Sequence, residues 1–194
     1  MRVELDSAHR IVSSESEDLI LVDADDQETG FVSKAKAHHG WGILHRAFSV
    51  FLFNEKGELL LQRRAVSKRL WPGFWSNSCC SHPRRGETMP VATRRRLREE
   101  LNIDAELEYV YKFMYQVQFG ELGAEHELCH VYLGRVDGDV HANDHEVESI
   151  RFLSAAELES EFAGGSGNFT PWFKMEWQSL KNNYAEQLLR YLAD

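Results

Sequence analysis

Four groups of residues in this 194-residue chain have the types and spacing that proton transfer or metal binding requires. The first is Cys80 with His82, inside the run Ser-Cys-Cys-Ser-His-Pro at 78–83. In an extended chain, residues two apart turn their side chains to the same side. A cysteine near a cation or a metal ion can ionise and react. The alternative is a buried structural cysteine beside a histidine that faces solvent.

The second group is the charged run Arg-Arg-Leu-Arg-Glu-Glu at 95–100. On a helix, residues four apart form ion pairs, and two Arg–Glu pairs have this spacing: Arg95 with Glu99, and Arg96 with Glu100. Such a run is usual on a solvated helix face. It would equally allow Glu99 or Glu100 to present an oxygen ligand to Mg²⁺ held on a phosphate.

The third group is Glu125 and Glu127, which strand periodicity puts on one face with His126 opposite. Two carboxylates this close are costly unless a metal ion lies between them or one is protonated. A surface edge strand is the alternative. The fourth group is the spaced histidine pair His38 and His45, which by itself is weak support for a metal site.

The elements that position these residues follow from the apolar pattern. Asn54-Glu55-Lys56-Gly57 is a hairpin signal, and residues 71–86, rich in Pro, Gly, Ser and Cys, are expected to be mostly loop. Strands are expected at 18–22, 47–53, 58–63, 107–119, 127–136 and 147–153. Helices are expected over 88–101, with Val91, Leu97 and Leu101 on one face, after the capping box of Ser154 and Glu157, and along the apolar spacing from 173 to 191. This order predicts a mixed α/β sandwich of the α+β kind in one domain over 18–194, preceded by a loose polar extension over 1–17.

The composition excludes several classes of protein. No apolar run is long enough to span a bilayer, and the N-terminus lacks the apolar core of a signal peptide, so a cytoplasmic location is expected. Three cysteines, two of them adjacent, do not form a disulfide framework. The 22 basic and 31 acidic residues give a net charge of −9, which disfavours binding to nucleic acid. The same charge would repel a small anionic substrate unless bases gather locally.

In the order in which they occur, these motifs resemble a known pattern. The run Ser81-x5-Glu87-x7-Arg95-Arg96-Leu97-x-Glu99-Glu100-x-Asn102-Ile103 is similar to a degenerate Nudix box, whose usual form is G-x5-E-x7-R-E-U-x-E-E-x-G-U. With the motifs around it, the chain resembles the type I isopentenyl-diphosphate Δ-isomerases, Nudix-fold enzymes that isomerise rather than hydrolyse. These motifs are Trp71-Pro72-Gly73, Arg63-Arg64-Ala65-x-Ser67-Lys68, Asn77 to Pro83, Glu125-x-Glu127-x-Cys129 and Thr170-Pro171-Trp172, and the resemblance covers about residues 19–177.

The departures from the box are informative. Arg96 stands where the box has glutamate. Hydrolases of this fold hold several metal ions with a cluster of glutamates, so this exchange removes a ligand and adds a phosphate-binding cation. Ser81 and Asn102 replace the two glycines of the box. Asparagine tolerates a positive φ better than most residues, so the turn after the helix is expected to form.

The resemblance implies the conversion of isopentenyl diphosphate into dimethylallyl diphosphate through a tertiary carbocation. Protonating the alkene on one face and removing a proton on the other requires two proton-transfer groups on opposite sides of a dry pocket. By resemblance these are Cys80 and Glu127, with Tyr115 hydrogen-bonded to Glu127. Trp172 would stabilise the cation with its ring face. Which of Cys80 and Glu127 donates the proton stays open.

The resemblance also implies metal ions and a cationic site for the diphosphate. One divalent ion, Mn²⁺, Zn²⁺ or Mg²⁺, would be held by His38, His45, His82, Glu125 and Glu127, a donor set that suits Zn²⁺ or Mn²⁺ better than Mg²⁺. A Mg²⁺ ion on the diphosphate would take Glu100 as its protein ligand. The remaining phosphate charge would be met by Lys34, Arg64, Lys68 and Arg96.

Two alternatives were weighed against the isomerase: a Nudix diphosphate hydrolase, and a metal-binding or interaction protein without catalysis. Arg96 and the Cys80–Glu127 pair speak against the hydrolase. The intact proton-transfer and phosphate-binding positions speak against the non-enzymatic protein. We therefore expect a small prenyl diphosphate as substrate, neither nucleic acid nor membrane as partner, and a monomer or weak homodimer.

Overall fold

The computed structural model describes residues 10–165 and 167–192, and strand β3 (His45–Phe53) runs through its centre. From Ala47 onward every residue of this strand except Ser49 is apolar, as expected of a strand covered on both faces. Ala47, Phe51 and Phe53 enter one hydrophobic core, and the alternate residues Phe48 and Val50 enter another on the opposite face. Strand β3 therefore separates two cores.

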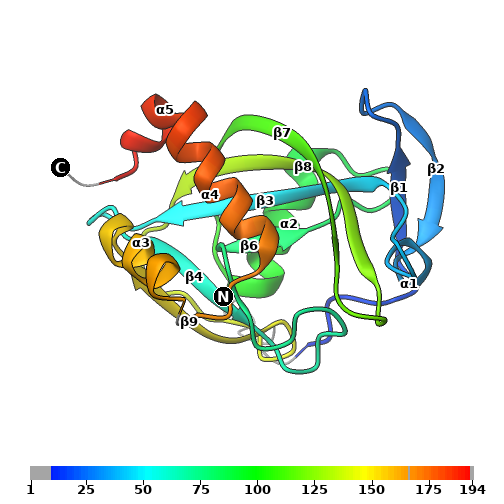
Figure 1. The fold of residues 1–194 in the computed structure, drawn as a ribbon, viewed down its shortest axis with the longest axis horizontal. Helices are drawn as coiled ribbons and strands as arrows, with labels where there is room; N and C mark the ends of the chain where they lie inside the picture. The colour runs from blue at the N-terminus through cyan, green and yellow to red at the C-terminus, as the bar shows by residue number, and fades with distance from the viewer. Residues whose placement is uncertain (1–9, 166, 193–194) are drawn as a thin grey trace, which may run out of the picture.

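The other strands extend from β3 into one mixed sheet (Figure 1). Strand β8 (Ala124–Arg135) pairs with β3 in parallel, whereas β1 (Asp18–Val22), β4 (Leu59–Arg64) and β6 (Cys79–Ser81) pair with it antiparallel. The remaining strands are β2 (Glu28–Ser33) on β1, β7 (Leu107–Gln118) on β8, and β5 (Trp75–Ser76) and β9 (Val147–Leu153) on β4. The parallel β3–β8 pair brings together residues about eighty positions apart in the chain, and this pair carries the site described below.

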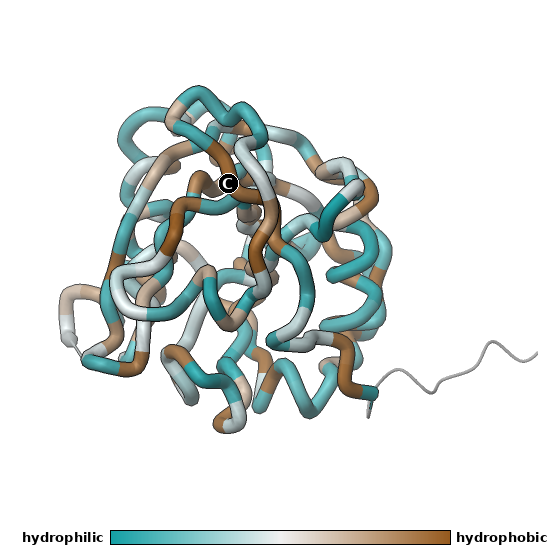
Figure 2. Tube along the Cα trace, turned by 90° about the vertical axis from the view of Figure 1, so that its right-hand side faces the viewer, coloured by the Kyte–Doolittle hydropathy of each residue, from teal (hydrophilic) through white to brown (hydrophobic). Residues whose placement is uncertain are grey.

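Helices cover both faces of the sheet (Figure 1). Helix α2 (Met89–Leu101) packs on the core that contains Phe48, while α3 (Ala155–Gly164), α4 (Pro171–Asn183) and α5 (Ala185–Leu189) pack on the core that contains Phe51. A single turn, α1 (Lys34–Ala37), links β2 to β3. In Figure 2 the hydrophobic stretches lie mainly in segments that cross the middle of the molecule. In the part of the chain described, no helix combines the length and the apolar character that crossing a bilayer requires.

This architecture confirms the predicted mixed α/β sandwich in a single domain. The hairpin between β3 and β4 forms at Asn54, whose side chain accepts hydrogen bonds from the backbone of Lys56 and Glu58. Ser154 and Glu157 form the predicted capping box of α3. Asn102 ends α2 with a φ of 55°, the left-handed conformation that its box position requires.

The segment 71–86 is mostly loop, as predicted, although it contains the short strands β5 and β6. Strand β2 and helix α1 were not predicted. Two local predictions were wrong. Val91 is 54% exposed, because a separation of six residues turns it away from the helix face of Leu97. The C-terminal helix is interrupted at Tyr184, where the backbone leaves the helical conformation. Of the predicted extension, residues 1–9 lie outside the described residues.

Candidate active site

The site residues gather on the α4 side of the sheet because strand alternation turns them there. Register pairs His45 with Glu127 across the parallel β3–β8 pair. It also pairs Ser49 with Cys80 across β3 and β6, and Tyr115 with Glu127 across β7 and β8. Since side chains at every second position share a face, residues 45, 49, 125, 127 and 129 point toward α4 together. They line or adjoin one cavity of about 640 Å³, counting its open mouth.

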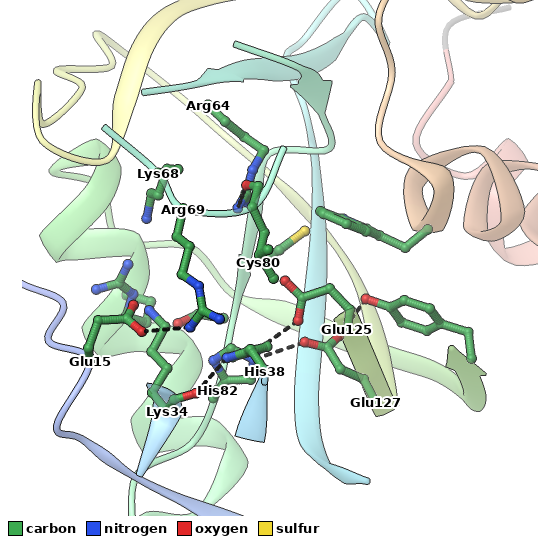
Figure 3. Close-up of a pocket in the computed structure, with 15 residues that line it drawn as sticks. Glu15, Lys34, His38, Arg64, Lys68, Arg69, Cys80, His82, Glu125 and Glu127 are labelled. Carbon is green, nitrogen blue, oxygen red and sulfur yellow. Dashed lines mark hydrogen bonds and ion pairs between the residues drawn. The ribbon is translucent and has the colours of Figure 1, made fainter. Parts of the chain in front are cut away.

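Five predicted ligands form one compact cluster. The candidate ligand atoms of His38, His45, His82, Glu125 and Glu127 all lie within 4.8 Å of one another. Oε1 of Glu127 lies 2.8 Å from Nε2 of His82 and 3.7 Å from Nε2 of His45. Figure 3 shows His38 and His82 facing the carboxylates of Glu125 and Glu127, with bases around the rest of the cavity.

The hydrogen bonds of the histidines prepare this cluster for a cation. Nδ1 of His38 donates to the carbonyl of Lys34 at 2.9 Å, and Nδ1 of His45 donates to that of Ile43 at 2.7 Å. Because a carbonyl only accepts, the two Nε2 atoms keep their lone pairs. In the described part of the chain, these Nε2 atoms and Oε2 of Glu125 are buried and make no hydrogen bond of acceptable geometry. Nε2 of His38 and Oε2 of Glu125 do lie close together, as an ion pair at 2.7 Å. This donor set fits a divalent metal ion.

The charges within the cluster perturb one another. Burial by itself would raise the pKa of Glu125, but the nearby His38 outweighs it and the pKa is lowered. Burial would likewise lower the pKa of His38, which the carboxylate of Glu125 raises instead. Burial and the repulsion of the other two histidines lower the pKa of His82 well below its ordinary value. The two carboxylates are therefore ionised, as metal ligands must be.

A close backbone contact fixes the position of His38 relative to the β7–β8 hairpin. The amide of Ala124 donates to the carbonyl of His38 at 3.1 Å. A Cβ on Gly123, which has a φ of +147°, would lie only 2.2 Å from that same carbonyl oxygen. Glycine at this position therefore allows the hairpin that carries Glu125 and Glu127 to reach the histidines.

Cys80 and Glu127, the two predicted proton-transfer residues, line the same cavity from different strands. The thiol of Cys80 donates to Oδ1 of Asn77 at 2.8 Å, and burial raises its pKa to about 12. Oε2 of Glu127 accepts a hydrogen bond of 2.6 Å from the hydroxyl of Tyr115. Burial would raise the pKa of Glu127, but His45 and Tyr115 lower it. In this structure the thiol thus carries a proton and the carboxylate does not.

The indole of Trp172 closes the cavity from α4. Its ring contacts Trp71 edge-on at 5.0 Å and lies 6.3 Å from the ring of Tyr115. The guanidinium of Arg64 lies over its face at 5.4 Å, held there by hydrogen bonds to the carbonyls of Leu70 and Trp71. The face of this ring therefore already contacts a cation in this structure.

The four predicted phosphate-binding bases, Lys34, Arg64, Lys68 and Arg96, all line the cavity. Burial and the charge of Lys68 lower the pKa of Lys34. Arg96 is buried, which disfavours its charge, but Glu100 and Glu146 raise its pKa and keep it a cation. The net charge of −9 thus coexists with a local concentration of bases.

Glu100, the predicted Mg²⁺ ligand, is buried in an ion pair with Arg96 and is not among the residues that line the cavity. Its role at the diphosphate stays a prediction. Glu146 was not predicted at all. It pairs with Lys68 and with Arg96, at 3.1 Å from the latter, and so holds both cations in position.

The described part of the N-terminal segment, residues 10–17, lies against these bases. The hydroxyl of Ser13 accepts from Lys34 at 2.6 Å, and the carbonyl of Val12 accepts from Arg96 at 3.3 Å. Glu15 lines the cavity itself. No sequence signal pointed to these contacts, since they join residues far apart in the chain.

Sequence reasoning also missed the polar residues behind Cys80. Ser49 lies 3.5 Å from its sulfur, and Ser76 lies 3.8 Å from it. Glu176 is completely buried on α4, one helical turn after Trp172. The sequence did contain a signal for Glu176. It lies four residues after Trp172, a predicted site residue, and a helix turns side chains four apart to the same face.

Comparisons with known proteins identify the family to which this chain belongs. A model of the NUDIX domain matches residues 43–173. Isopentenyl-diphosphate Delta-isomerase 1 of Photorhabdus laumondii is 41% identical over 174 residues, which are 89% of this chain and 99% of that protein. The isopentenyl-diphosphate Delta-isomerase of Serratia proteamaculans is 44% identical over 90% of this chain and 97% of its own length. That of Burkholderia multivorans is 45% identical over 81% and 89%.

Solved structures share the fold. DR0079 from Deinococcus radiodurans is 25% identical with a TM-score of 0.67, covering 82% of this chain and 96% of its own. RenU, described as a Nudix hydrolase from M. smegmatis, is 18% identical with a TM-score of 0.52, covering 86% and 94%. With the domain match, these similarities confirm the predicted Nudix-type fold.

Proposed function

The chain belongs to the NUDIX family and, within it, to the isopentenyl-diphosphate Delta-isomerases, and from this membership we propose that its cavity converts isopentenyl diphosphate into dimethylallyl diphosphate. One observation carries the proposal to individual residues. Cys80 and Glu127 reach one cavity from different strands, beside a cluster of four bases and under an indole ring. The protein is an enzyme, and its substrate is a small prenyl diphosphate.

Cys80 and Glu127 exchange protons with the substrate. One of them adds a proton to the terminal alkene carbon, which leaves a tertiary carbocation, and the other removes a proton from the carbon next to the cation. The hydrogen bond from Tyr115 holds the carboxylate of Glu127 in one orientation. The buried surroundings of Cys80 exclude water, which would otherwise trap the cation as an alcohol.

The substrate is positioned by its two ends. The diphosphate binds Lys34, Arg64, Lys68 and Arg96, whose charges balance it far from the reacting carbons. The prenyl group then lies against Trp172, whose ring face stabilises the carbocation by about 2 kcal/mol in a desolvated site. Arg64, which now lies over that ring and donates to the carbonyls of Leu70 and Trp71, would exchange these partners for the diphosphate.

His38, His45, His82, Glu125 and Glu127 would hold one divalent ion, which supplies positive charge beside Glu127 and lets two carboxylates lie close together. Three imidazoles and two carboxylates favour Mn²⁺ or Zn²⁺ over Mg²⁺. A Mg²⁺ ion on the diphosphate would take Glu100 as its protein ligand, in exchange for the ion pair that Glu100 now makes with Arg96. The monomer or weak homodimer acts in a reducing compartment such as the cytoplasm, which keeps Cys80 a free thiol.

Hydrolysis of the diphosphate is not favoured. Arg96 occupies a position where the hydrolase box has a glutamate, and its guanidinium is already paired with Glu100 and Glu146. A guanidinium at this position can bind phosphate. It cannot coordinate a metal ion that activates a water molecule for attack.

The test is to incubate the purified protein with isopentenyl diphosphate and Mg²⁺ and to separate the products. We expect dimethylallyl diphosphate and no inorganic phosphate. Cys80→Ala and Glu127→Gln are expected to lose turnover while keeping the circular dichroism spectrum of the unmodified protein. Release of phosphate, or either variant keeping most of its rate, would contradict the proposal.

Matched controls separate chemistry from packing. Cys79→Ala removes the neighbouring thiol, which faces the α2 core rather than the cavity. Glu121→Gln neutralises an exposed glutamate in the β7–β8 turn. Both controls are expected to keep the rate of the unmodified protein.

A further inference from the structure

Glu176 is an acid in an apolar place that the proposed chemistry does not use. It lies on α4 among Phe173, Trp177 and Leu180 and is completely buried. Its Oε1 accepts a hydrogen bond from the thiol of Cys129 at 3.5 Å, and its Oε2 is buried without a hydrogen-bond partner in the described part of the chain. Burial raises the pKa of Glu176 to about 8, so the group is a neutral carboxylic acid at neutral pH.

Ser49 lies between this acid and the proton-transfer thiol. It is 1% exposed, and its hydroxyl oxygen lies 3.5 Å from the sulfur of Cys80 and 3.4 Å from that of Cys129. Ser49 and Glu176 share a neighbour, because the sulfur of Cys129 also lies 3.5 Å from Oε1 of Glu176. A hydrogen bond from Ser49 lowers the pKa of Glu176, whereas burial raises it. A serine hydroxyl has one proton to donate, so Ser49 can serve either Cys80 or Glu176 as a donor, but not both at once.

We propose that Glu176 is a positioning residue for the isomerisation: as a neutral acid it donates a hydrogen bond to Ser49 and thereby directs the single hydroxyl proton of Ser49 to the sulfur of Cys80. The proposal rests on the proposed function, in which Cys80 exchanges a proton with substrate. The sulfur is negatively charged at one stage of that exchange, whichever way the proton moves. A donor to a charged sulfur stabilises that stage more than a bond between neutral groups.

An ionised Glu176 reverses this arrangement. A carboxylate only accepts, so Ser49 turns to it and Cys80 loses its donor while facing a second negative charge. The titratable groups that face Glu176 are Cys129 and Glu127 from β8, Cys80 from β6, and Tyr111 from β7, whose hydroxyl donates to the backbone carbonyl of Glu176. Strand β3 contributes Ser49. The surroundings named here hold no base, which keeps the acid neutral.

The test compares replacements of Glu176 in the full-length, metal-loaded enzyme, with kcat and KM measured from pH 6 to 9. For the unmodified enzyme we expect kcat to decline around pH 8. Glu176→Gln carries an amide that donates at every pH, so we expect nearly unchanged kcat at pH 7 and no such decline. Glu176→Met has a similar size but no donor, and we expect kcat to fall about 3- to 10-fold with KM unchanged. Glu186→Gln, an exposed glutamate on α5, is the matched control and keeps the original pH profile.

A double variant shows whether Glu176 acts through Ser49. Ser49→Ala is expected to lower kcat about as much as Glu176→Met, and the two changes together should cost little more than either one, because they interrupt the same chain of hydrogen bonds. Additive losses, or Glu176→Gln as slow as Glu176→Met, would overturn the proposal and leave Glu176 a packing residue.

Infrared spectroscopy gives a readout that does not depend on activity. We expect the carbonyl band of a protonated carboxylic acid at pH 6 in the unmodified protein and its loss in Glu176→Gln. If the band is absent from the unmodified protein, Glu176 is ionised and the proposal is wrong. An unmodified enzyme that shows this band but does not convert isopentenyl diphosphate would instead refute the proposed function.

Discussion

Removing the hydroxyl of Tyr115 tests the role of Glu127 with the loss of a single atom. Tyr115 is buried, and its hydroxyl donates to Oε2 of Glu127 at 2.6 Å. A hydrogen bond to a charged group contributes about 1.5–3 kcal/mol. Since one pKa unit corresponds to about 1.4 kcal/mol, Tyr115→Phe should raise the pKa of Glu127 by about 1–2. If the orientation of this carboxylate matters equally in the transition state, kcat should fall about 10- to 100-fold.

The assay is the steady-state conversion of isopentenyl diphosphate, together with the midpoint of thermal unfolding and the bound metal per chain. We expect lower kcat, little change in KM and full metal content, because the ring that packs beside Trp172 is retained. Tyr109→Phe, an exposed tyrosine on the same strand, is the control. A kcat within about threefold of the unmodified enzyme, well below the loss worked out from the hydrogen bond, would refute the reasoning. So would a loss of rate that follows a loss of metal.

Three further predictions concern the rest of the site. The purified enzyme should hold about one tightly bound divalent ion per chain, and His82→Ala should weaken that binding at least about tenfold in metal titrations. The control is His141→Ala, which replaces an exposed histidine. Unchanged metal affinity in His82→Ala would exclude this site. Trp172→Leu should lower kcat about 30-fold, the equivalent of about 2 kcal/mol of cation–π stabilisation, and a change in KM alone would contradict a role in the transition state. Burial would raise the pKa of Glu146, but Lys68 and Arg96 lower it to about 2, so its charge stabilises the fold above pH 4.5 and that contribution is lost as the pH falls toward 2. Glu146→Gln should therefore lower the free energy of unfolding by about 3 kcal/mol at pH 7 and by less at pH 3, whereas an equal loss at both values would show that the charge is not responsible.

The predictions that held from sequence depended on local patterns. The capping box of Ser154 and Glu157 and the turn at Asn54 involve residues three or four apart, and the left-handed Asn102 needs only its own backbone. The failures had separate causes. Helix α1 is a single turn, too short for any periodic pattern to predict. The helix breaks at Tyr184 without a nearby proline or glycine that would have signalled the break.

The five predicted metal ligands, His38, His45, His82, Glu125 and Glu127, illustrate what the sequence determines about this protein. Their types and order, and their resemblance to a known family, were sufficient to predict a metal site, because the chemistry of imidazole and carboxylate does not depend on the fold. That they lie within 4.8 Å of one another depends on the parallel register of β3 with β8 and on the close approach of Gly123 to His38.

Only the tertiary structure decided which groups act on these residues. Two sets of contacts span more than thirty positions of chain: Glu146 with Lys68 and Arg96, and Ser49 with the sulfurs of Cys80 and Cys129. Burial then changes the protonation of these groups, keeping Glu176 neutral while neighbouring cations keep Glu146 ionised. The sequence by itself determined which chemical groups the enzyme has. Packing decided which of them are charged, because the energy of a buried charge depends on partners that only the folded chain brings near.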